Sequence, residues 1–331
     1  MQTRRLGANG PQVSAVGLGT MGMSGISGMH AMYGPTDEGE SLATLRRALE
    51  LGINFFDTAE VYGPYRNEEL LGRGLAGWSG EVVVASKFGF RIGDDGRIQG
   101  TDGSPANARR ALDASLQRLG RERIDLWYLH RLDRNVPIED TVGAMAEGVK
   151  SGKVRWLGLS EVGAATLRRA CKVHPITALQ SEYSLWERNL DNELVGVCRE
   201  LGVGIVAYCP LGRGFLAGGV ASAEELPAGD YRKLDPRFAE ANHARNMTIV
   251  AAVAEIAERH GVSSAQIALA WLLQHNRDVV PIPGTKRRRY VEENAAAADI
   301  RLNAVDIARL DALQGASGPR YNANSMQSID R

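Results

Sequence analysis

The sequence is poor in cysteine, and its few cysteines exclude two kinds of structure. Only Cys171, Cys198 and Cys209 occur among the 331 residues, an odd number with no Cys-x-x-Cys pair. A disulfide framework and a thiolate zinc site are therefore excluded. The motif His-Glu-x-x-His is absent as well, so the usual signatures of a catalytic metal are missing and we expect none.

The chain also lacks a surplus of either charge and lacks long apolar runs. Its 39 Lys and Arg residues balance its 39 Asp and Glu residues, whereas a general nucleic-acid binder needs excess basic residues to release counterions. The longest apolar stretches, such as Ile267–Leu273, fall far short of the ~20 residues that span a bilayer. Met1–Gly7 lacks the apolar core of a signal peptide. We therefore expect a cytoplasmic protein with neither nucleic acid nor membrane as a partner.

Short apolar runs of strand length recur along the chain. Those that are apolar almost throughout are Ile53–Asp57, Val82–Lys87, Ile124–His130, Val154–Ser160, Thr177–Glu182, Gly204–Tyr208 and Val279–Pro283. Such strands are typical of a parallel sheet that is buried on both faces. A further run, Val13–Gly19, is weaker because it contains two glycines and a serine.

Helical patterns lie between these runs. Glu40–Leu51 carries leucines on one side, and Ala106–Leu119 follows a start signal of serine and proline. Met247–His260 and Ser263–Gln274 are two further patterns, separated by a glycine. Glycines end several patterns just before the next strand, which is typical of helix C-termini. The count of about eight β-α units predicts a closed (β/α)8 barrel, with an open doubly wound sheet as the alternative.

The barrel prediction divides the chain into a domain and a tail. We expect residues 1–314 to form a single barrel domain and residues 315–331 to form a tail that either is mobile or folds over a surface. Phe88–Asn107 and Leu211–Asn246 do not fit the repeating units, and both follow predicted strands. In a barrel they would project at the C-terminal face, where substrate loops lie.

Gly17–Gly22 matches the dinucleotide fingerprint Gly-x-Gly-x-x-Gly. That fingerprint works only where a helix follows, because the helix N-terminus binds the pyrophosphate. The next residues, Met23–Gly28, are too rich in glycine to form a helix. We therefore interpret these glycines as a loop that leaves the first strand.

Polar side chains stand at the ends of three consecutive predicted strands. Asp57, Lys87 and His130 each close a strand, and Tyr62 follows Asp57 on the next loop. Each of them taken singly has an ordinary structural explanation, as a loop cap, a solvated lysine or a structural histidine. Because parallel strands of a barrel end at one face, their order along the chain favours a common active site.

These side chains suit one kind of chemistry. The pKa of a phenol is ordinarily about 10, and a neighbouring ammonium lowers it. We expect Tyr62 to be a general acid, Lys87 to lower its pKa, Asp57 to orient Lys87, and His130 to position a carbonyl oxygen by a hydrogen bond. The set contains no redox centre, so a hydride must come from a cofactor.

The same segments resemble a known family. The strongest matches are Asn54–Gly63, Ser86–Lys87 and Leu129–Arg131, and further ones are Gly158–Ser160, Leu179–Ser184, Ala207–Leu211 and Pro281–Thr285. Over nearly the whole chain they resemble the aldo-keto reductase superfamily, in particular the branch with perakine-reductase-like and pyridoxal-reductase-like enzymes. The resemblance implies reduction of aldehydes and ketones by NADPH at the C-terminal face of a (β/α)8 barrel.

The resemblance also implies roles for individual residues. The family's catalytic tetrad falls on Asp57, Tyr62, Lys87 and His130. The implied contacts of the nicotinamide are Ser160 and Gln180 at the carboxamide and Tyr208 stacked on the ring, and Thr20, Met21 and Asp57 are further implied cofactor contacts. The implied contacts of the diphosphate are Pro210, Leu211 and Gly212, and those of the adenosine are Glu293 and Asn294.

The basic run Lys286–Arg289 has two interpretations. In isolation it resembles a nucleic-acid or targeting patch, but the chain has no net positive charge. The resemblance instead implies that Gly284, Thr285 and Lys286 bind the adenosine 2′-phosphate, together with one arginine, for which we choose Arg288. This arrangement favours NADPH over NADH.

The sequence departs from the family at three positions near the cofactor. Glu161 stands where many relatives have Asn, Cys209 where many have Ser, and Gly284 where some have Lys. Glu161 can accept a hydrogen bond from a carboxamide but cannot donate one.

The substrate implied is a small-molecule carbonyl compound. We expect Tyr62 and His130 to face its oxygen, and apolar walls made by Met23, Tyr33, Phe88, Trp127 and Trp186. A core role for Trp127 and Trp186 is the alternative. A second class of function is a regulatory NADP-binding subunit of the same fold, as in potassium-channel β subunits. The sequence leaves the oligomeric state open.

Overall fold

The structure is a computed structural model that describes residues 1–24, 34–219, 224, 226, 230–322 and 326–330. Its centre is one parallel sheet in the order β12-β11-β10-β9-β8-β5-β4-β3. These strands are β3 (Leu18–Gly19), β4 (Phe55–Asp57), β5 (Val83–Phe88), β8 (Ile124–Leu129), β9 (Val154–Ser160), β10 (Ile176–Glu182), β11 (Gly204–Tyr208) and β12 (Val279–Pro281).

The two edge strands meet and close the sheet. The Gly17 N–H donates to the carbonyl oxygen of Pro281 at 2.9 Å, and the Gly19 N–H donates to that of Pro283 at 3.3 Å. A Cβ atom on Gly19 would lie 2.9 Å from the carbonyl oxygen of Ile282, so only glycine allows this approach. The predicted (β/α)8 barrel is confirmed, and the open doubly wound alternative is excluded.

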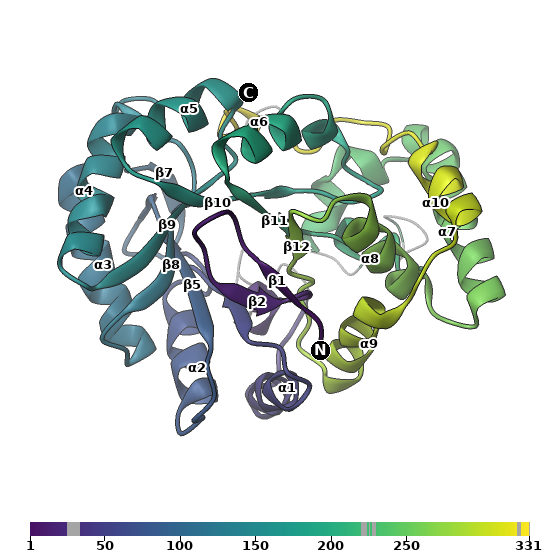
Figure 1. Ribbon diagram of the computed structural model, residues 1–331, viewed down its shortest axis with the longest axis horizontal. Coiled ribbons are helices and arrows are strands. Elements are labelled where there is room, and N and C mark those ends of the chain that lie inside the picture. Colours follow the sequence, from purple (N-terminus) through teal and green to yellow (C-terminus); the bar gives the residue numbers. More distant parts are fainter. Residues whose placement is uncertain (25–33, 220–223, 225, 227–229, 323–325, 331) are drawn as a thin grey trace.

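Helices surround the strands (Figure 1). They are α1 (Glu38–Glu50), α2 (Arg66–Leu75), α3 (Pro105–Leu119), α4 (Ile138–Lys150), α5 (Ala164–Val173), α6 (Leu194–Leu201), α7 (Glu240–His260), α8 (Ser264–His275), α9 (Arg288–Ala296) and α10 (Ala304–Asp311). The start signal before α3 works as expected, since the Ser104 side chain accepts the N–H of Asn107. In the described ranges no helix is both long and apolar enough to cross a membrane.

The core has an inner and an outer layer, because side chains alternate along each strand. Inward-facing residues such as Phe55, Leu126 and Val206 form a cluster within the barrel. Leu6 and Val13 complete this cluster from the N-terminal hairpin of β1 (Thr3–Arg5) and β2 (Gln12–Ser14). The hairpin lies across the middle of the ring in Figure 1 and so covers the end of the barrel that holds the strand N-termini. The outward-facing residues pack against the helices.

The structure differs from the expected elements in three places. Val13–Gly19 is not one strand: its first residues belong to β2, and only Leu18 and Gly19 belong to β3. The expected loop Phe88–Asn107 contains a hairpin of β6 (Phe90–Ile92) and β7 (Ile98–Thr101). Helix α7 begins at Glu240 rather than Met247, because its first turns are polar and carry no apolar periodicity.

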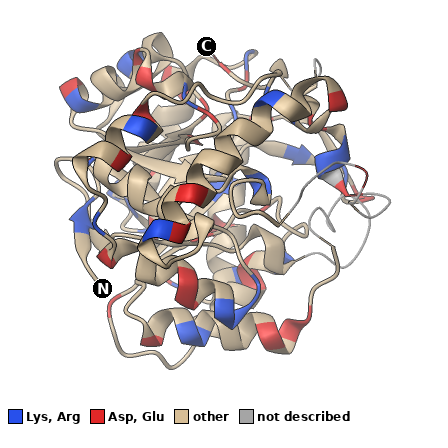
Figure 2. Ribbon diagram, turned by 90° about the vertical axis from the view of Figure 1, so that its right-hand side faces the viewer, with Lys and Arg blue, Asp and Glu red and all other residues tan. Residues whose placement is uncertain are grey.

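Charges of both signs are interspersed over the helices, as Figure 2 shows for one side of the molecule. Many of them pair between neighbouring helices. For example, Arg309 of α10 donates to Glu255 of α7 at 2.6 Å. Exposed pairs of this kind contribute little stability individually.

Candidate active site

The structure brings together the four polar residues that the sequence placed at strand ends. Asp57 ends β4, Lys87 lies in β5, His130 directly follows β8, and Tyr62 lies on the loop after β4. The Lys87 ammonium donates to the Asp57 carboxylate, to the Thr58 carbonyl oxygen at 2.8 Å and to the Tyr62 hydroxyl at 3.3 Å. The Tyr62 and His130 rings lie edge to face with centroids 5.8 Å apart. An acid, a phenol, an ammonium and an imidazole therefore share the C-terminal mouth of the barrel.

Burial and neighbouring charges set the protonation of this cluster. Burial alone would lower the pKa of Lys87, but Asp57 and Tyr62 raise it above its ordinary value, so the ammonium stays charged. Burial, followed by Lys87 and Arg131, lowers the pKa of His130 well below its ordinary value, so the imidazole is neutral. Its Nδ1 atom is buried and has no hydrogen-bond partner among the described residues.

The pKa of Tyr62 differs from the expectation. Burial raises it above the ordinary phenol value, and the lowering by Lys87 does not compensate. The expected net lowering is therefore wrong for this structure, because a phenolate loses more hydration here than one ammonium returns. The effect of Lys87 nevertheless has the expected sign.

Buried amides hold the cluster in place. The Gln180 amide in β10 donates to the second Asp57 oxygen at 2.7 Å. The Asn67 side chain in α2 accepts from the Thr20 and Thr58 hydroxyls at 2.5 and 2.6 Å and donates to the Thr20 carbonyl oxygen at 2.8 Å. Sequence reasoning missed Asn67, whose only signal is a polar residue in the first turn of a helix.

Glu60 is a second buried carboxyl group on the Tyr62 loop. It accepts the Gly89 N–H at 3.1 Å, and 2% of its surface is exposed. Burial raises its pKa to about 7. Sequence reasoning did not single it out, because only the fold removes it from water.

The residues assigned to the nicotinamide end lie at the ends of neighbouring strands. Ser160 ends β9 and Tyr208 ends β11, next to β10 with Gln180. Arg131 donates to the carbonyl oxygen of His130 at 2.8 Å and to the Ser160 hydroxyl at 3.3 Å, which connects Ser160 to the cluster of four polar residues. On the other side, Thr20 and Met21 follow β3, and the Thr20 N–H donates to the Asp57 carbonyl oxygen at 3.0 Å.

The residues assigned to the diphosphate form a tight turn after β11. Pro210 and Leu211 lead into a short 3-10 helix that starts at Gly212. Gly212 has a φ of 56°, and a Cβ atom there would lie 3.0 Å from the Trp186 ring. The position therefore requires glycine, and the turn is closed by its own hydrogen bond from the Gly212 N–H to the carbonyl oxygen of Cys209 at 3.0 Å.

The residues assigned to the 2′-phosphate follow β12. Gly284 is exposed, Thr285 is buried, and the Lys286 ammonium donates to the carbonyl oxygens of Gly34 and Pro35 at 3.1 and 2.6 Å. Burial and Arg287 lower the pKa of Lys286.

An open hollow of about 550 Å³ lies at the N-terminus of α9, lined by Glu40, Arg287, Arg288, Arg289 and Glu292. Arg288 pairs with Glu40 at 3.0 Å. Glu293 and Asn294, assigned to the adenosine, lie further along the same helix.

The residues assigned to the pocket walls fall in different places. Met23 is buried in η1 (Met21–Met23) and belongs to the core cluster between the sheet and the helices. Tyr33 lies outside the described residues. Trp186 packs against Phe215 with ring centroids 4.2 Å apart, and only 1% of its surface is exposed. Trp186 is therefore a core residue, which was the alternative to a place in the pocket wall.

Phe88 and Trp127 do not line the pocket. Their rings stack at 4.4 Å, fully buried in the layer between the sheet and the helices. Trp127 pairs in register with Ser86, which donates to Glu68 of α2 and so faces outward. The expectation is wrong because side chains alternate along a strand, and Lys87 between them faces inward.

Phe90 is an aromatic residue that sequence reasoning missed. It begins the β6–β7 hairpin, and its ring lies edge to face with His130 at 4.9 Å. The sequence predicts a loop at Phe88–Asn107, and no pattern in it indicates this contact.

The fold and this cluster define the class of protein. The sequence model of the Aldo/keto reductase family matches residues 15–314, and the chain belongs to that family. Enzymes of the family are oxidoreductases that reduce small carbonyl compounds and generally use a nicotinamide cofactor.

Individual relatives resemble the chain over almost its whole length. A probable aldo-keto reductase 1 from Glycine max is 43% identical over 310 residues, which cover 93% of this chain and 87% of the relative. The structure of a glycerol dehydrogenase from Gluconobacter oxydans has a TM-score of 0.85 at 28% identity, covering 94% of each chain. A thermostable aldo-keto reductase, Tm1743, solved with the inhibitor epalrestat, has a TM-score of 0.75 at 29% identity and covers 95% of this chain and 100% of its own.

Proposed function

We propose that this chain is an NADPH-dependent carbonyl reductase in which Tyr62 is the general acid. The observation that carries the proposal is the contact of the Tyr62 hydroxyl with the buried Lys87 ammonium, beside a neutral His130. Bound NADPH supplies the hydride that adds to the carbonyl carbon.

The residues of the chain handle the proton and the developing charge. Tyr62 donates its proton to the carbonyl oxygen, and the Lys87 ammonium stabilises the phenolate that remains. Asp57 keeps Lys87 charged and in place through their buried ion pair. His130 is neutral, so it offers a ring N–H to the carbonyl oxygen without adding a positive charge.

The donor set at the mouth fits a nicotinamide dinucleotide phosphate. The Ser160 hydroxyl and the Gln180 amide suit the carboxamide, and the hydrogen bond to Asp57 holds the Gln180 side chain in place. The Tyr208 ring is suited to stack on the face of the nicotinamide ring. The glycine-dependent turn at Gly212, with Pro210 and Leu211, suits a diphosphate.

The other end of the site fits a 2′-phosphate. Lys286 and the arginines around the hollow at the start of α9 supply cations next to a helix N-terminus, which favours a dianion. We assign Gly284, Thr285 and Lys286 to the phosphate, with Arg288, and Glu293 and Asn294 to the adenosine. Arg288 must leave Glu40 or share it to make this contact.

Substitution of Tyr62 by phenylalanine tests the proposal. Tyr62→Phe removes the acid but keeps the ring, so we expect unchanged NADPH binding and loss of p-nitrobenzaldehyde turnover by at least about 100-fold. NADPH binding is measured by fluorescence titration and turnover by NADPH absorbance. Turnover at the wild-type rate would show that Tyr62 is not the acid. A wild-type protein that binds NADPH but reduces no member of a carbonyl panel would favour the regulatory subunit instead.

A further inference from the structure

The segment after α10 is packed onto the mouth of the barrel. The Ala316 N–H donates to the carbonyl oxygen of Trp186 at 2.8 Å, so the segment starts beside the packed rings of Trp186 and Phe215. At its far end, the Asp330 N–H donates to the Glu161 carbonyl oxygen at 3.1 Å, and the Asp330 carboxylate accepts the Gly163 N–H at 3.0 Å. The tail is therefore hydrogen-bonded to the residues that directly follow β9, the strand that ends in Ser160.

Glu161 is the centre of this attachment. Its carboxylate accepts from both Nη atoms of Arg320, with an Nη1–Oε1 distance of 3.1 Å, and from the Ser181 hydroxyl at 2.9 Å. Burial would raise the pKa of Glu161, but Arg320 and Arg131 lower it to about 2. Glu161 and Arg320 are 3% and 5% exposed, so the pair is a buried charged pair. Because a buried charge needs its partner, Arg320 holds the Glu161 side chain in place directly after Ser160, together with the Ser181 hydroxyl and the Glu182 N–H.

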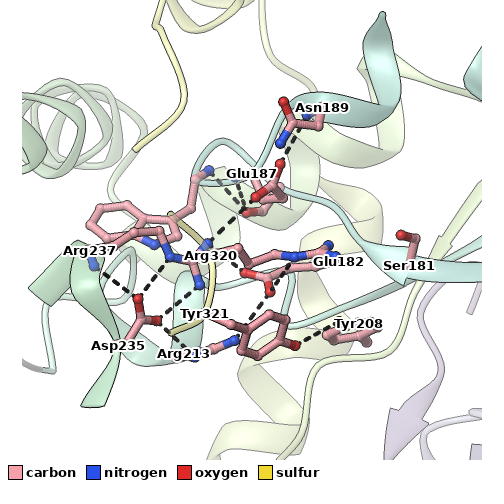
Figure 3. A network of polar contacts seen from close by, with 12 residues as sticks. Ser181, Glu182, Glu187, Asn189, Tyr208, Arg213, Asp235, Arg237, Arg320 and Tyr321 are labelled. Carbon is pink, nitrogen blue, oxygen red and sulfur yellow. Dashed lines mark hydrogen bonds and ion pairs between the residues drawn. The ribbon is translucent and has the colours of Figure 1, made fainter. Parts of the chain in front are cut away.

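Tyr321 contacts the aromatic residue of the site. Its hydroxyl lies 2.9 Å from the Tyr208 hydroxyl, which forms a hydrogen bond between the two phenols (Figure 3). The guanidinium groups of Arg213 and Arg320 lie 4.7 and 5.4 Å from the centre of the Tyr321 ring. Arg213 in turn pairs with Asp235 at 2.8 Å, so Tyr321 is held by a buried ionic network.

We propose that Arg320 and Tyr321 are positioning residues for the nicotinamide end of the cofactor site. Arg320 neutralises Glu161 and so fixes Ser160, and Tyr321 fixes the ring of Tyr208 by the bond between their hydroxyls. This inference rests on the proposed function, because it assigns Ser160 and Tyr208 to the nicotinamide. It also explains how the chain tolerates a glutamate where many relatives have asparagine: the tail supplies the charge that glutamate needs.

Tyr321→Phe tests the inference with two ligands. The variant removes the hydrogen bond that orders the Tyr208 ring in the free protein, so ordering that ring becomes part of NADPH binding and we expect the Kd of NADPH to rise about fivefold. The Kd of 2′-phospho-ADP-ribose, which lacks the nicotinamide, should stay at the wild-type value. Both are measured by isothermal titration calorimetry. A Kd for NADPH equal to that of the wild type, or an equal rise for both ligands, would overturn the inference.

A matched control separates positioning from general loss of stability. Tyr183→Phe also removes a hydrogen-bonded phenol hydroxyl, but that hydroxyl donates to Asp191, which ends a short 3-10 helix, η3 (Asn189–Asp191). We expect wild-type Kd values for both ligands in this control. A weakening of NADPH as large as in Tyr321→Phe would overturn the inference, because any lost phenol hydroxyl would then suffice.

Arg320 needs a double variant, because Arg320→Met alone leaves a buried unpaired carboxylate and endangers folding. Glu161→Gln with Arg320→Met removes both charges, and we expect about fivefold weaker NADPH binding with unchanged binding of 2′-phospho-ADP-ribose. A wild-type Kd for NADPH in the folded double variant would exclude Arg320 as a positioning residue. Failure of the wild type itself to bind NADPH would overturn the proposed function, which distinguishes it from a failure confined to the tail variants.

Discussion

Glu60 offers a quantitative test of the electrostatics of the loop that carries Tyr62. Burial raises its pKa from 4.5 to about 7 in the folded chain. Between these two values the folded state keeps a proton on Glu60 that the unfolded state has lost. Because the folded state then binds more protons, the free energy of unfolding falls as the pH rises through this window and levels off above it.

The substitution Glu60→Gln isolates this contribution. Glutamine keeps the shape of the side chain and an oxygen for the Gly89 N–H, but it does not titrate. We compare the free energy of unfolding of the variant with that of the wild type. At about 1.4 kcal/mol per pKa unit, this difference should shift in favour of the variant by roughly 2 to 3 kcal/mol between about pH 5 and about pH 8.

Urea unfolding followed by circular dichroism at both pH values measures this gain. Glu122→Gln is the matched control, since Glu122 is exposed and the same substitution there removes no buried carboxyl group. If the stability difference between Glu60→Gln and the wild type were the same at both pH values, Glu60 would not be the buried neutral acid described above.

Three further outcomes follow from the site and the core. Lys286→Ala should weaken NADPH much more than NADH in a fluorescence titration, and equal weakening of both would remove the 2′-phosphate assignment. Trp127→Phe should lower the thermal midpoint by several degrees and leave the KM for carbonyl substrates unchanged, because the Trp127 ring packs in the outer layer. A raised KM at unchanged stability would indicate that Trp127 lines the pocket. The pKa of Glu161 is about 2, so its stabilising contribution is present above pH 4.5 and is lost as the pH falls toward 2. Acid unfolding curves of the wild type and Glu161→Gln should therefore converge at low pH, and a constant separation would contradict the ion pair with Arg320.

Most of the barrel could be predicted because its strands carry a strong local signal. β9 and β11 begin and end where the apolar runs do, and α3 starts at the predicted cap. The hairpins at Thr3–Ser14 and Phe90–Thr101 were missed, because short strands pair only when a surface nearby fixes them. The start of α7 was missed for a related reason: its polar turns are helical by continuation of the helix and carry no pattern of their own.

The residues of the site also differ in whether a local sequence signal could predict them. Asp57, Lys87 and His130 could be placed together from their positions at strand ends, because parallel strands must end at one face. The walls around them could not, since a strand presents alternate residues to opposite sides and the phase is set by packing. Phe88 next to Lys87 shows the difference, as one residue of offset moves an aromatic ring from the pocket to the helix layer.

The amino-acid sequence by itself determined the repeating β-α order, the face that carries the chemistry and the residue types at that face. Apolar runs, terminal glycines and strand-end polar residues act over a few positions, so they can be found along the chain. Only the tertiary structure decided the protonation of Tyr62, Glu60 and Glu161 and the attachment of the tail through Arg320 and Tyr321. Those features depend on loss of water and on contacts between residues more than a hundred positions apart, which no local pattern records.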